Sequence, residues 1–392
     1  MRRIYFDHAA TTKVDPEVKK AMLPYLGDKF GNPSSIFYKE GQDAHKAIDE
    51  SREKVAEFLN AKVEEIIFTS GGTESDNLAL KGIFEANKNK GNHIIVSSVE
   101  HHAILHSCQY LEKYHGAKVT YLPVDKCGIV AIEDLKKAIT TKTILVSIMY
   151  VNNEVGTIEP IAEIGKLLKN LNQKRENRIY FHTDAVQGAG YLDCDLQKLG
   201  VDALSMSAHK IYGPKGVGVL YLRKGIPFVP QAQGGGQEGG KRAGTENVAG
   251  IVGLAKAIEL IKQNKKETGR IENLRNKLVE GILKTVPDAI FTGSKIGPNR
   301  LISSASFCFK NVEGESLLMS LDQAGIASSS GSACTSGSLD PSHVLIAMGL
   351  KPEVAHGSLR LTLGKENTEN EVDYFLKVLP GIVKRLRTIS PF

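Results

Sequence analysis

The stretch from Ile66 to Ser75 reads Ile-Ile-Phe-Thr-Ser-Gly-Gly-Thr-Glu-Ser. Its first three residues are apolar, as in a buried strand, and residues 75–87 have the periodicity of a helix. A glycine pair before a helix lets the backbone approach an anion, and the first helical turn offers unpaired N–H groups. The loop lacks the lysine of a P-loop and the third glycine of a dinucleotide-binding loop. It indicates a phosphate site of another kind, unless Thr73 only caps the helix.

The same alternation of apolar runs and amphipathic segments extends over residues 42–222. We predict strands at 66–68, 94–98, 119–122, 144–151, 179–183 and 217–222. We predict helices at 42–59, 75–87, 104–114, 132–139 and 161–171. Nearly continuous apolar strands suit burial on both faces, and their alternation with helices is typical of a mostly parallel sheet flanked by helices. The expected fold class is therefore α/β.

The pattern changes after residue 246. Helices are expected at 248–263, 271–284 and 371–385, with alternating strands at 304–310 and 358–363. We expect three units: an N-terminal segment 1–14 that packs with the small domain, a large domain 15–255, and a smaller α+β domain 256–392. Between the last two strands, residues 327–339 form a serine-rich loop that contains Cys334.

Composition excludes several classes of protein. The chain has 392 residues and a net charge of +6 without a long Lys/Arg block, so nucleic acid and membrane surfaces are not expected partners. No apolar run approaches the ~20 residues of a spanning helix. The N-terminus reaches Asp7 before any apolar core, which argues against a signal peptide. Five scattered cysteines without a CxxC pair fit a reducing cytoplasm and do not indicate a structural zinc site.

Two further motifs carry chemistry. Asp184 ends an apolar strand, where open α/β sheets keep their ligands, and a carboxylate there needs a cationic partner unless it caps the next turn. Lys210 follows an apolar segment and precedes a Gly/Pro turn, which suits a Schiff-base lysine better than a surface lysine because Ser207 and His209 adjoin it. A phosphate cradle, a strand-end aspartate and such a lysine are together what pyridoxal phosphate requires.

The sequence resembles the cysteine desulfurases, which are class V aminotransferase-like enzymes of pyridoxal phosphate fold type I. The motifs that carry the resemblance are residues 5–12, 68–77, 100–103, 151–156, 184–187, 207–210, 242–245, 329–336 and 359–361. The resemblance covers essentially the whole chain. Cys334 within a long serine-rich loop resembles the group I branch.

The resemblance implies a role for each matching residue. Lys210 would form the Schiff base, Asp184 would pair with the ring nitrogen, and Gln187 would donate to the phenolic oxygen. The implied phosphate-binding residues are Gly72, Thr73, Ser207, His209 and, from the other subunit of a homodimer, Thr245. His101 would stack on the ring and move protons, and Asn153 and Arg360 would bind the substrate carboxylate. Cys334 would take sulfur from L-cysteine, and could also ligate a nascent iron–sulfur cluster. No resident metal is expected.

The implied reaction yields L-alanine and a persulfide on Cys334, which passes sulfur to an iron–sulfur scaffold or another acceptor. Rival interpretations are a selenocysteine lyase, a fold-type-I aminotransferase, or a non-catalytic sulfur-carrier or assembly subunit. Without the resemblance, Arg360 would be taken for a solvated strand residue. His102 and His106, four residues apart near Cys108, could bind zinc, but a fourth ligand and an HExxH glutamate are lacking.

Overall fold

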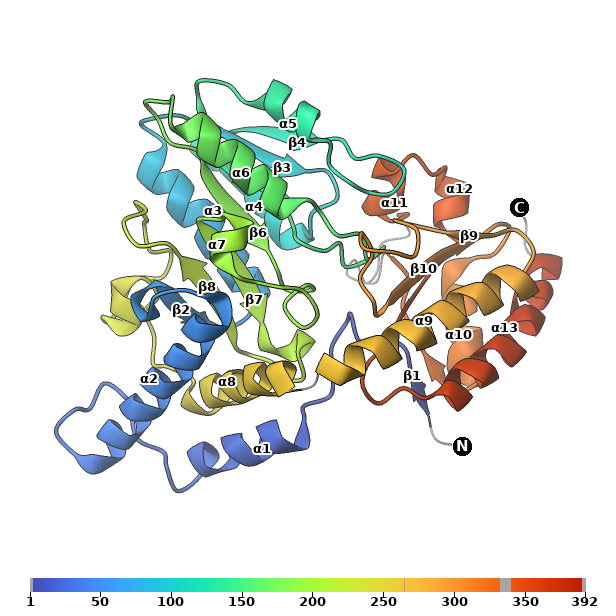
Figure 1. Cartoon of the computed structure of the whole chain (residues 1–392), viewed down its shortest axis with the longest axis horizontal. Helices are drawn as coiled ribbons and strands as arrows, with labels where there is room; N and C mark the ends of the chain where they lie inside the picture. Colours follow the sequence, from blue (N-terminus) through green and yellow to red (C-terminus); the bar gives the residue numbers. More distant parts are fainter. Residues whose placement is uncertain (1–2, 264, 332–339, 390–392) are drawn as a thin grey trace.

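A seven-stranded sheet forms the centre of the larger part of the molecule. The computed structural model describes residues 3–263, 265–331 and 340–389 (Figure 1). In spatial order the strands are β2 (Ile66–Thr69), β8 (Gly218–Leu222), β7 (Ala203–Ser207), β6 (Tyr180–Asp184), β5 (Thr143–Ser147), β3 (His93–Ser97) and β4 (Lys118–Leu122). From β7 to β4 neighbouring strands are parallel, and β8 runs antiparallel to both β7 and β2. The predicted mostly parallel sheet is confirmed.

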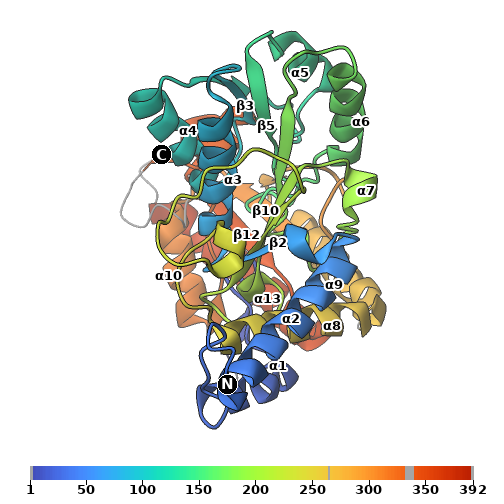
Figure 2. The same cartoon turned by 90° about the vertical axis from the view of Figure 1, so that its left-hand side faces the viewer.

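Helices cover both faces of this sheet (Figure 2). On one face lie α3 (Gly72–Asn87) and α4 (His102–His115). On the other lie α1 (Pro16–Met22), α2 (Lys39–Leu59), α5 (Ile132–Ala138), α6 (Ile161–Asn172), α7 (Leu196–Leu199) and α8 (Val248–Gln263). Because successive side chains of a strand point to opposite faces, Ile67 packs into the core under α3 and α4, while Ile66 and Phe68 pack into the core on the opposite face of the sheet. This two-sided burial explains why the strands read as unbroken apolar runs.

A second core lies around a three-stranded antiparallel sheet. Its elements are β9 (Ala289–Phe291), β10 (Ser304–Phe309), β12 (Ser358–Thr362), α9 (Lys265–Thr285), α10 (Gly314–Gln323) and α13 (Glu369–Ile389). Strand β1 (Ile4–Tyr5) pairs in parallel with β11 (Ile326–Ala327), and Ile4 and Phe6 belong to this second core. Two short helices, α11 (His343–Ala347) and α12 (Pro352–Ala355), complete this part.

Several elements differ from the sequence prediction. Strand β5 ends at Ser147 instead of residue 151, and the N–H of Met149 donates to the Glu100 carboxylate. Strand β7 was not predicted as a strand, because Ser205 and Ser207 interrupt its apolar pattern, although all five of its residues are buried. Helices α1 and α10 were also missed. Thr73 does not cap α3, since the N-cap residue is Gly71.

None of the helices in the described ranges is long and apolar enough to cross a membrane.

Candidate active site

The candidate site lies at one edge of the large sheet. Because β8 runs opposite to its two neighbours, β2, β7 and β6 all end at this edge. β2 leads into the glycine loop, β7 ends at Ser207, and β6 ends at Asp184. After Ser207 a short 3-10 turn, η3 (Ala208–Lys210), carries Lys210. The fold thus brings the three predicted motifs to the edge where parallel sheets keep their ligands.

Glycines let the loop lie close to its neighbours. A Cβ atom on Gly218 would lie 2.7 Å from the Cα and carbonyl carbon of Gly71. A Cβ on Gly72 would lie 2.7 Å from Cγ2 of Val186 and 3.7 Å from Cβ of Ser207. The loop therefore packs directly against Ser207 and against the turn after Asp184. Thr73 is exposed in the first turn of α3, where the N–H groups have no partner within the helix.

Two ion pairs hold the segment of residues 238–242 in place, one to the first turn of α3 and one to α2. Glu74 accepts a 2.7 Å hydrogen bond from the Ser70 N–H and a 2.8 Å bond from Nε of Arg242. Glu238 accepts two hydrogen bonds from Arg52, of 2.6 and 2.9 Å, and its side chain is 2% exposed. Thr245, on the segment that follows Arg242, is exposed instead of lying in the site of its own chain.

Asp184 is buried at the end of β6. Its Oδ1 accepts a 2.8 Å hydrogen bond from the N–H of Val186. Burial raises the pKa of this carboxyl, whereas the Val186 hydrogen bond and the ammonium of Lys210 lower it. A buried carboxylate is costly without a cationic partner, so this position suits a protonated ring nitrogen.

Two buried titratable groups beside Asp184 were missed by the sequence analysis. His182 makes hydrogen bonds of 2.8 Å with Ser147 and 2.9 Å with Ser205, and burial lowers its pKa to about 3. Asp76 of α3 lies 3.7 Å from His182, and its Oδ1 has no hydrogen-bond partner. Burial, and then the neighbouring Asp184, raise the pKa of Asp76 well above its usual value.

The sequence spacing could have predicted that one of these two groups, His182, lies near Asp184. His182 precedes Asp184 by two residues in the same strand, so the two side chains share a face of the sheet. Asp76 gives no comparable signal, because its burial depends on how α3 packs on the sheet. Burial disfavours the charged form of both groups, whereas the Lys210 ammonium favours the charged form of Asp184.

The N-terminal segment closes over the lysine. Nζ of Lys210 donates to the carbonyl oxygens of Ala9 (2.5 Å) and Ala10 (2.8 Å). Nε2 of Gln187 donates to Ala9 as well (3.0 Å), and the His209 ring lies 3.2 Å from the Thr11 hydroxyl. Three predicted cofactor residues thus meet at residues 9–11.

His101 is the N-cap residue of α4, and its Nδ1 accepts a 3.1 Å hydrogen bond from the Ala103 N–H. This bond leaves the ring proton on Nε2. Burial, followed by the charge of Lys210, lowers the pKa of His101 to about 4. The imidazole is therefore neutral near pH 7 and can accept or relay a proton.

The predicted carboxylate-binding residues touch each other. Nη1 of Arg360 donates to the backbone oxygen of Asn153 at 3.0 Å, and Nη2 donates to Oδ1 of Asp7 at 3.0 Å. Arg360 is 3% exposed, so the alternative of a solvated strand residue is wrong. A small cavity is lined by Asn153, Gln187 and Lys210 together with the N-terminal segment.

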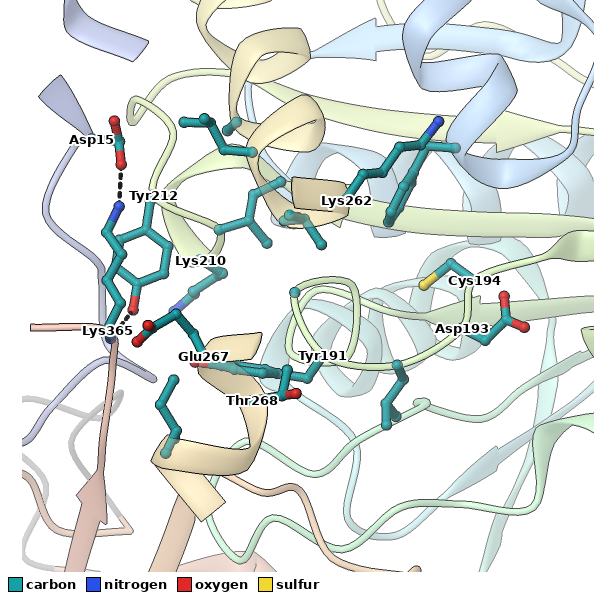
Figure 3. Close-up of a pocket in the computed structure, with 18 of the residues that line it drawn as sticks. Asp15, Tyr191, Asp193, Cys194, Lys210, Tyr212, Lys262, Glu267, Thr268 and Lys365 are labelled. Carbon is teal, nitrogen blue, oxygen red and sulfur yellow. Dashed lines mark hydrogen bonds and ion pairs between the residues drawn. The ribbon is translucent and has the colours of Figure 1, made fainter. Parts of the chain in front are cut away.

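A larger cavity, of about 620 Å³, lies beside α8, α9 and the turn at Tyr191–Cys194 (Figure 3). Lys210 lines its wall, but the other predicted site residues do not. This cavity is therefore not the candidate active site, in spite of its size.

Of the four cysteines in the described residues, Cys108, Cys194 and Cys308 are buried and Cys127 is partly exposed. Burial raises the pKa of Cys194 and of Cys308 to about 12, and also raises that of Cys108. Such thiols are poor nucleophiles at neutral pH. Cys334 lies outside the described residues, so its predicted role has no geometry here.

The proposed zinc ligands do not converge on a metal site. The rings of His102 and His106 stack, with centroids 4.8 Å apart, and the His343 ring lies 4.7 Å from His102. Within the described ranges, no group of three or more His, Cys, Asp or Glu side chains could hold a metal ion.

With this geometry in place, comparisons with known proteins define the class of the protein. The aminotransferase class-V family model matches residues 4–375, so the chain belongs to that family. Its relatives include the cysteine desulfurase IscS of Clostridium botulinum, 55% identical over 391 residues that cover 100% of this chain and 96% of the relative. The cysteine desulfurase IscS of Dictyoglomus turgidum is 53% identical over 392 residues, which cover 100% of this chain and 97% of the relative.

Solved structures of similar proteins support the same family assignment. A NifS-like protein superposes with a TM-score of 0.90 at 41% identity, covering 98% of this chain and all of the other. The apo structure of a cysteine desulfurase from Thermococcus onnurineus NA1 gives a TM-score of 0.86 at 29% identity, covering 98% and 95%. The family resemblance and fold type predicted from the sequence are confirmed.

Proposed function

We propose that this chain is a pyridoxal phosphate-dependent cysteine desulfurase that converts L-cysteine to L-alanine and passes the sulfur to Cys334. The observation that carries the proposal is the meeting of the glycine loop, Asp184 and Lys210 at one sheet edge. Full-length relatives named cysteine desulfurase, at up to 55% identity, support the same activity.

The residues at this edge fit the cofactor. The N–H groups after Gly72, with the side chains of Thr73, Ser207 and His209, would hold its phosphate. Asp184 would pair with the ring nitrogen, Gln187 would donate to the phenolic oxygen, and His101 would stack on the ring. Bound there, pyridoxal phosphate supplies an electron-accepting ring that stabilises negative charge at the substrate Cα.

The substrate would be oriented by its carboxylate. Nε of Arg360 is buried and has no hydrogen-bond partner, so the guanidinium still has an N–H to offer to an incoming acceptor. A carboxylate is a strong acceptor for a guanidinium N–H. Lys210 would move a proton at the substrate Cα, and the neutral imidazole of His101 would handle the proton of the substrate thiol.

Cys334 would complete the reaction as a thiolate that attacks the substrate sulfur. The S–S bond forms as the Cβ–S bond breaks, and a proton takes the place of sulfur at Cβ. One cysteine and one enzyme thiol thus become one alanine and one persulfide. An iron–sulfur scaffold or another acceptor protein would then receive the sulfur, in the reducing cytoplasm that a free thiol requires.

The active form would be a homodimer. Six large apolar side chains between residues 23 and 38 are more than half exposed, and the three most exposed are Leu26 (68%), Phe30 (76%) and Phe37 (92%). Exposed apolar side chains grouped in this way indicate a protein interface. Thr245, exposed in its own chain, would then reach the phosphate in the partner's site.

Two variants test the function. Cys334→Ser should keep the cofactor and still bind cysteine, but should release almost no alanine, because a hydroxyl cannot accept sulfur. In Lys210→Ala, borohydride should no longer fix the cofactor covalently to the chain. Alanine release at the wild-type rate by Cys334→Ser would refute the nucleophile, and keto-acid release by the wild type would indicate an aminotransferase instead.

A further inference from the structure

The N-terminal segment supplies a carboxylate to the substrate-binding arginine. Oδ1 of Asp7 accepts a 3.0 Å hydrogen bond from Nη2 of Arg360, and Oδ2 accepts a 2.7 Å bond from the hydroxyl of Ser329. The Asp7 side chain is 14% exposed and the Arg360 side chain 3%. This is a mostly buried ion pair whose acid is fixed by a second donor.

The backbone also holds the acid in place. Asp7 forms a parallel bridge with Thr362, and the N–H of Ala9 donates to the Thr362 hydroxyl at 2.8 Å. Thr362 and Arg360 are two residues apart in β12, so both side chains point to the same face. The segment that carries Asp7 is therefore attached to the strand that carries Arg360.

Two of the three guanidinium nitrogens of Arg360 have hydrogen-bond partners. Nη1 donates to the Asn153 carbonyl and Nη2 to Asp7, and these two bonds fix the plane of the guanidinium. Nε is buried without an acceptor. A buried donor that lacks a partner is unfavourable, so this position suits an acceptor that arrives with the substrate.

We propose that Asp7 is a positioning residue for substrate binding: it fixes Arg360 so that the unpartnered Nε–H can receive the carboxylate of the amino acid substrate. The inference rests on the proposed function. Asp7 acts through Arg360 and does not itself contact the reacting atoms.

The test uses the cofactor-loaded enzyme and L-alanine, which has the substrate carboxylate but no sulfur. The change in visible absorbance of the bound cofactor on titration gives the dissociation constant of L-alanine, and steady-state assays give KM and kcat for cysteine. Asp7→Ala should weaken alanine binding and raise KM by about tenfold, because a hydrogen bond to a charged group is lost. Cofactor content per chain should stay at the wild-type level.

Two companion variants sharpen the test. Asp7→Asn keeps an acceptor oxygen and should restore most of the alanine affinity. Ser329→Ala leaves the Asp7–Arg360 contact in place and should change the affinity by less than about threefold. Equal or tighter alanine binding by Asp7→Ala would overturn the proposal, and tighter binding would identify Asp7 as an anion that competes with the substrate.

Failure of the proposed function would give a different experimental result from failure of the positioning role alone. In that case wild-type protein would bind no cofactor, or L-alanine would leave the absorbance unchanged, and the inference would fail with it. If the wild type responds to alanine while Asp7→Ala matches it, only the positioning role is refuted.

Discussion

Gly72→Ala should weaken cofactor binding more than it weakens the fold. The new Cβ would lie 2.7 Å from Cγ2 of Val186, whereas carbon atoms in contact prefer about 3.5–4.0 Å. Val186 is β-branched and stiff at χ1, and its N–H donates to Asp184 at 2.8 Å. The glycine loop and the Asp184 turn must therefore separate by nearly an ångström, at a cost of about 1–3 kcal/mol.

Most of this cost should fall on the cofactor-bound state, which needs phosphate and ring contacts at the same time. The dissociation constant of pyridoxal phosphate should rise about tenfold to a hundredfold. Alanine at the first position of α3 is a better helix former than glycine, which offsets part of the strain in the apoprotein. The thermal midpoint of the apoprotein should consequently fall only slightly.

Cofactor titration of the apoprotein, followed by absorbance, measures the effect. The matched control is Gly72→Ala combined with Val186→Ala, which removes the atom that the new Cβ would meet and should restore the affinity of the Val186→Ala single variant. A Gly72→Ala affinity within about twofold of wild type, or a loss that persists unchanged in the double variant, would refute the packing argument.

Three further variants test other parts of the structure. Burial raises the pKa of Glu100 to about 8, so the contribution of this residue to stability should fall as pH rises from about 4.5 through 8. Above pH 8 Glu100→Gln should therefore melt higher than wild type, and equal midpoints there would contradict this. Arg52→Ala leaves the buried Glu238 carboxylate without its cation and should cost about 3–5 kcal/mol in urea unfolding, while a loss below about 1 kcal/mol would contradict the pairing. Phe37→Asp should shift the protein from dimer to monomer by light scattering with an unchanged circular dichroism spectrum, and a dimer that persists would place the interface elsewhere.

The sequence predicted the fold class well where local pattern and tertiary packing agree. Strands such as β2 and β3 lie between two layers of helices. Both of their faces are therefore buried and apolar, and the sequence pattern predicts the same kind of strand. The pattern failed at β7, where the buried Ser205 and Ser207 look like one solvated face. The hydroxyl of Ser205 forms a hydrogen bond with the buried His182. Ser207 ends the strand beside the glycine loop. The polarity that hid the strand marks its place next to the candidate site.

Arg360 illustrates what a sequence without a structure cannot give. In β12 it alternates with leucines, and this pattern alone indicates a side chain in solvent. The structure buries it because Asp7, 353 residues away, closes over it from a segment with its own short strand pairing. Such a pair is favourable only when both charges are buried together, since either one alone would carry the full cost of desolvation.

The same reasoning applies to the acids around Asp184. Asp76 and Glu100 sit in motifs with several polar neighbours, and nothing in those motifs distinguishes a surface acid from a buried one. Once buried, they cannot all be charged, and burial raises the pKa of each. The charge of Lys210 lowers the pKa of Asp184, whereas the charges of Asp184 and Glu100 raise the pKa of Asp76. At this sheet edge the charge of Lys210 thus favours a negative charge on Asp184, the position that the proposed cofactor would need, while burial disfavours a charge on Asp76 and Glu100. For Asp76 this follows from the packing of α3 on the sheet, so substitutions in that packing can change the charge of Asp76 while every residue of the predicted motifs stays in place.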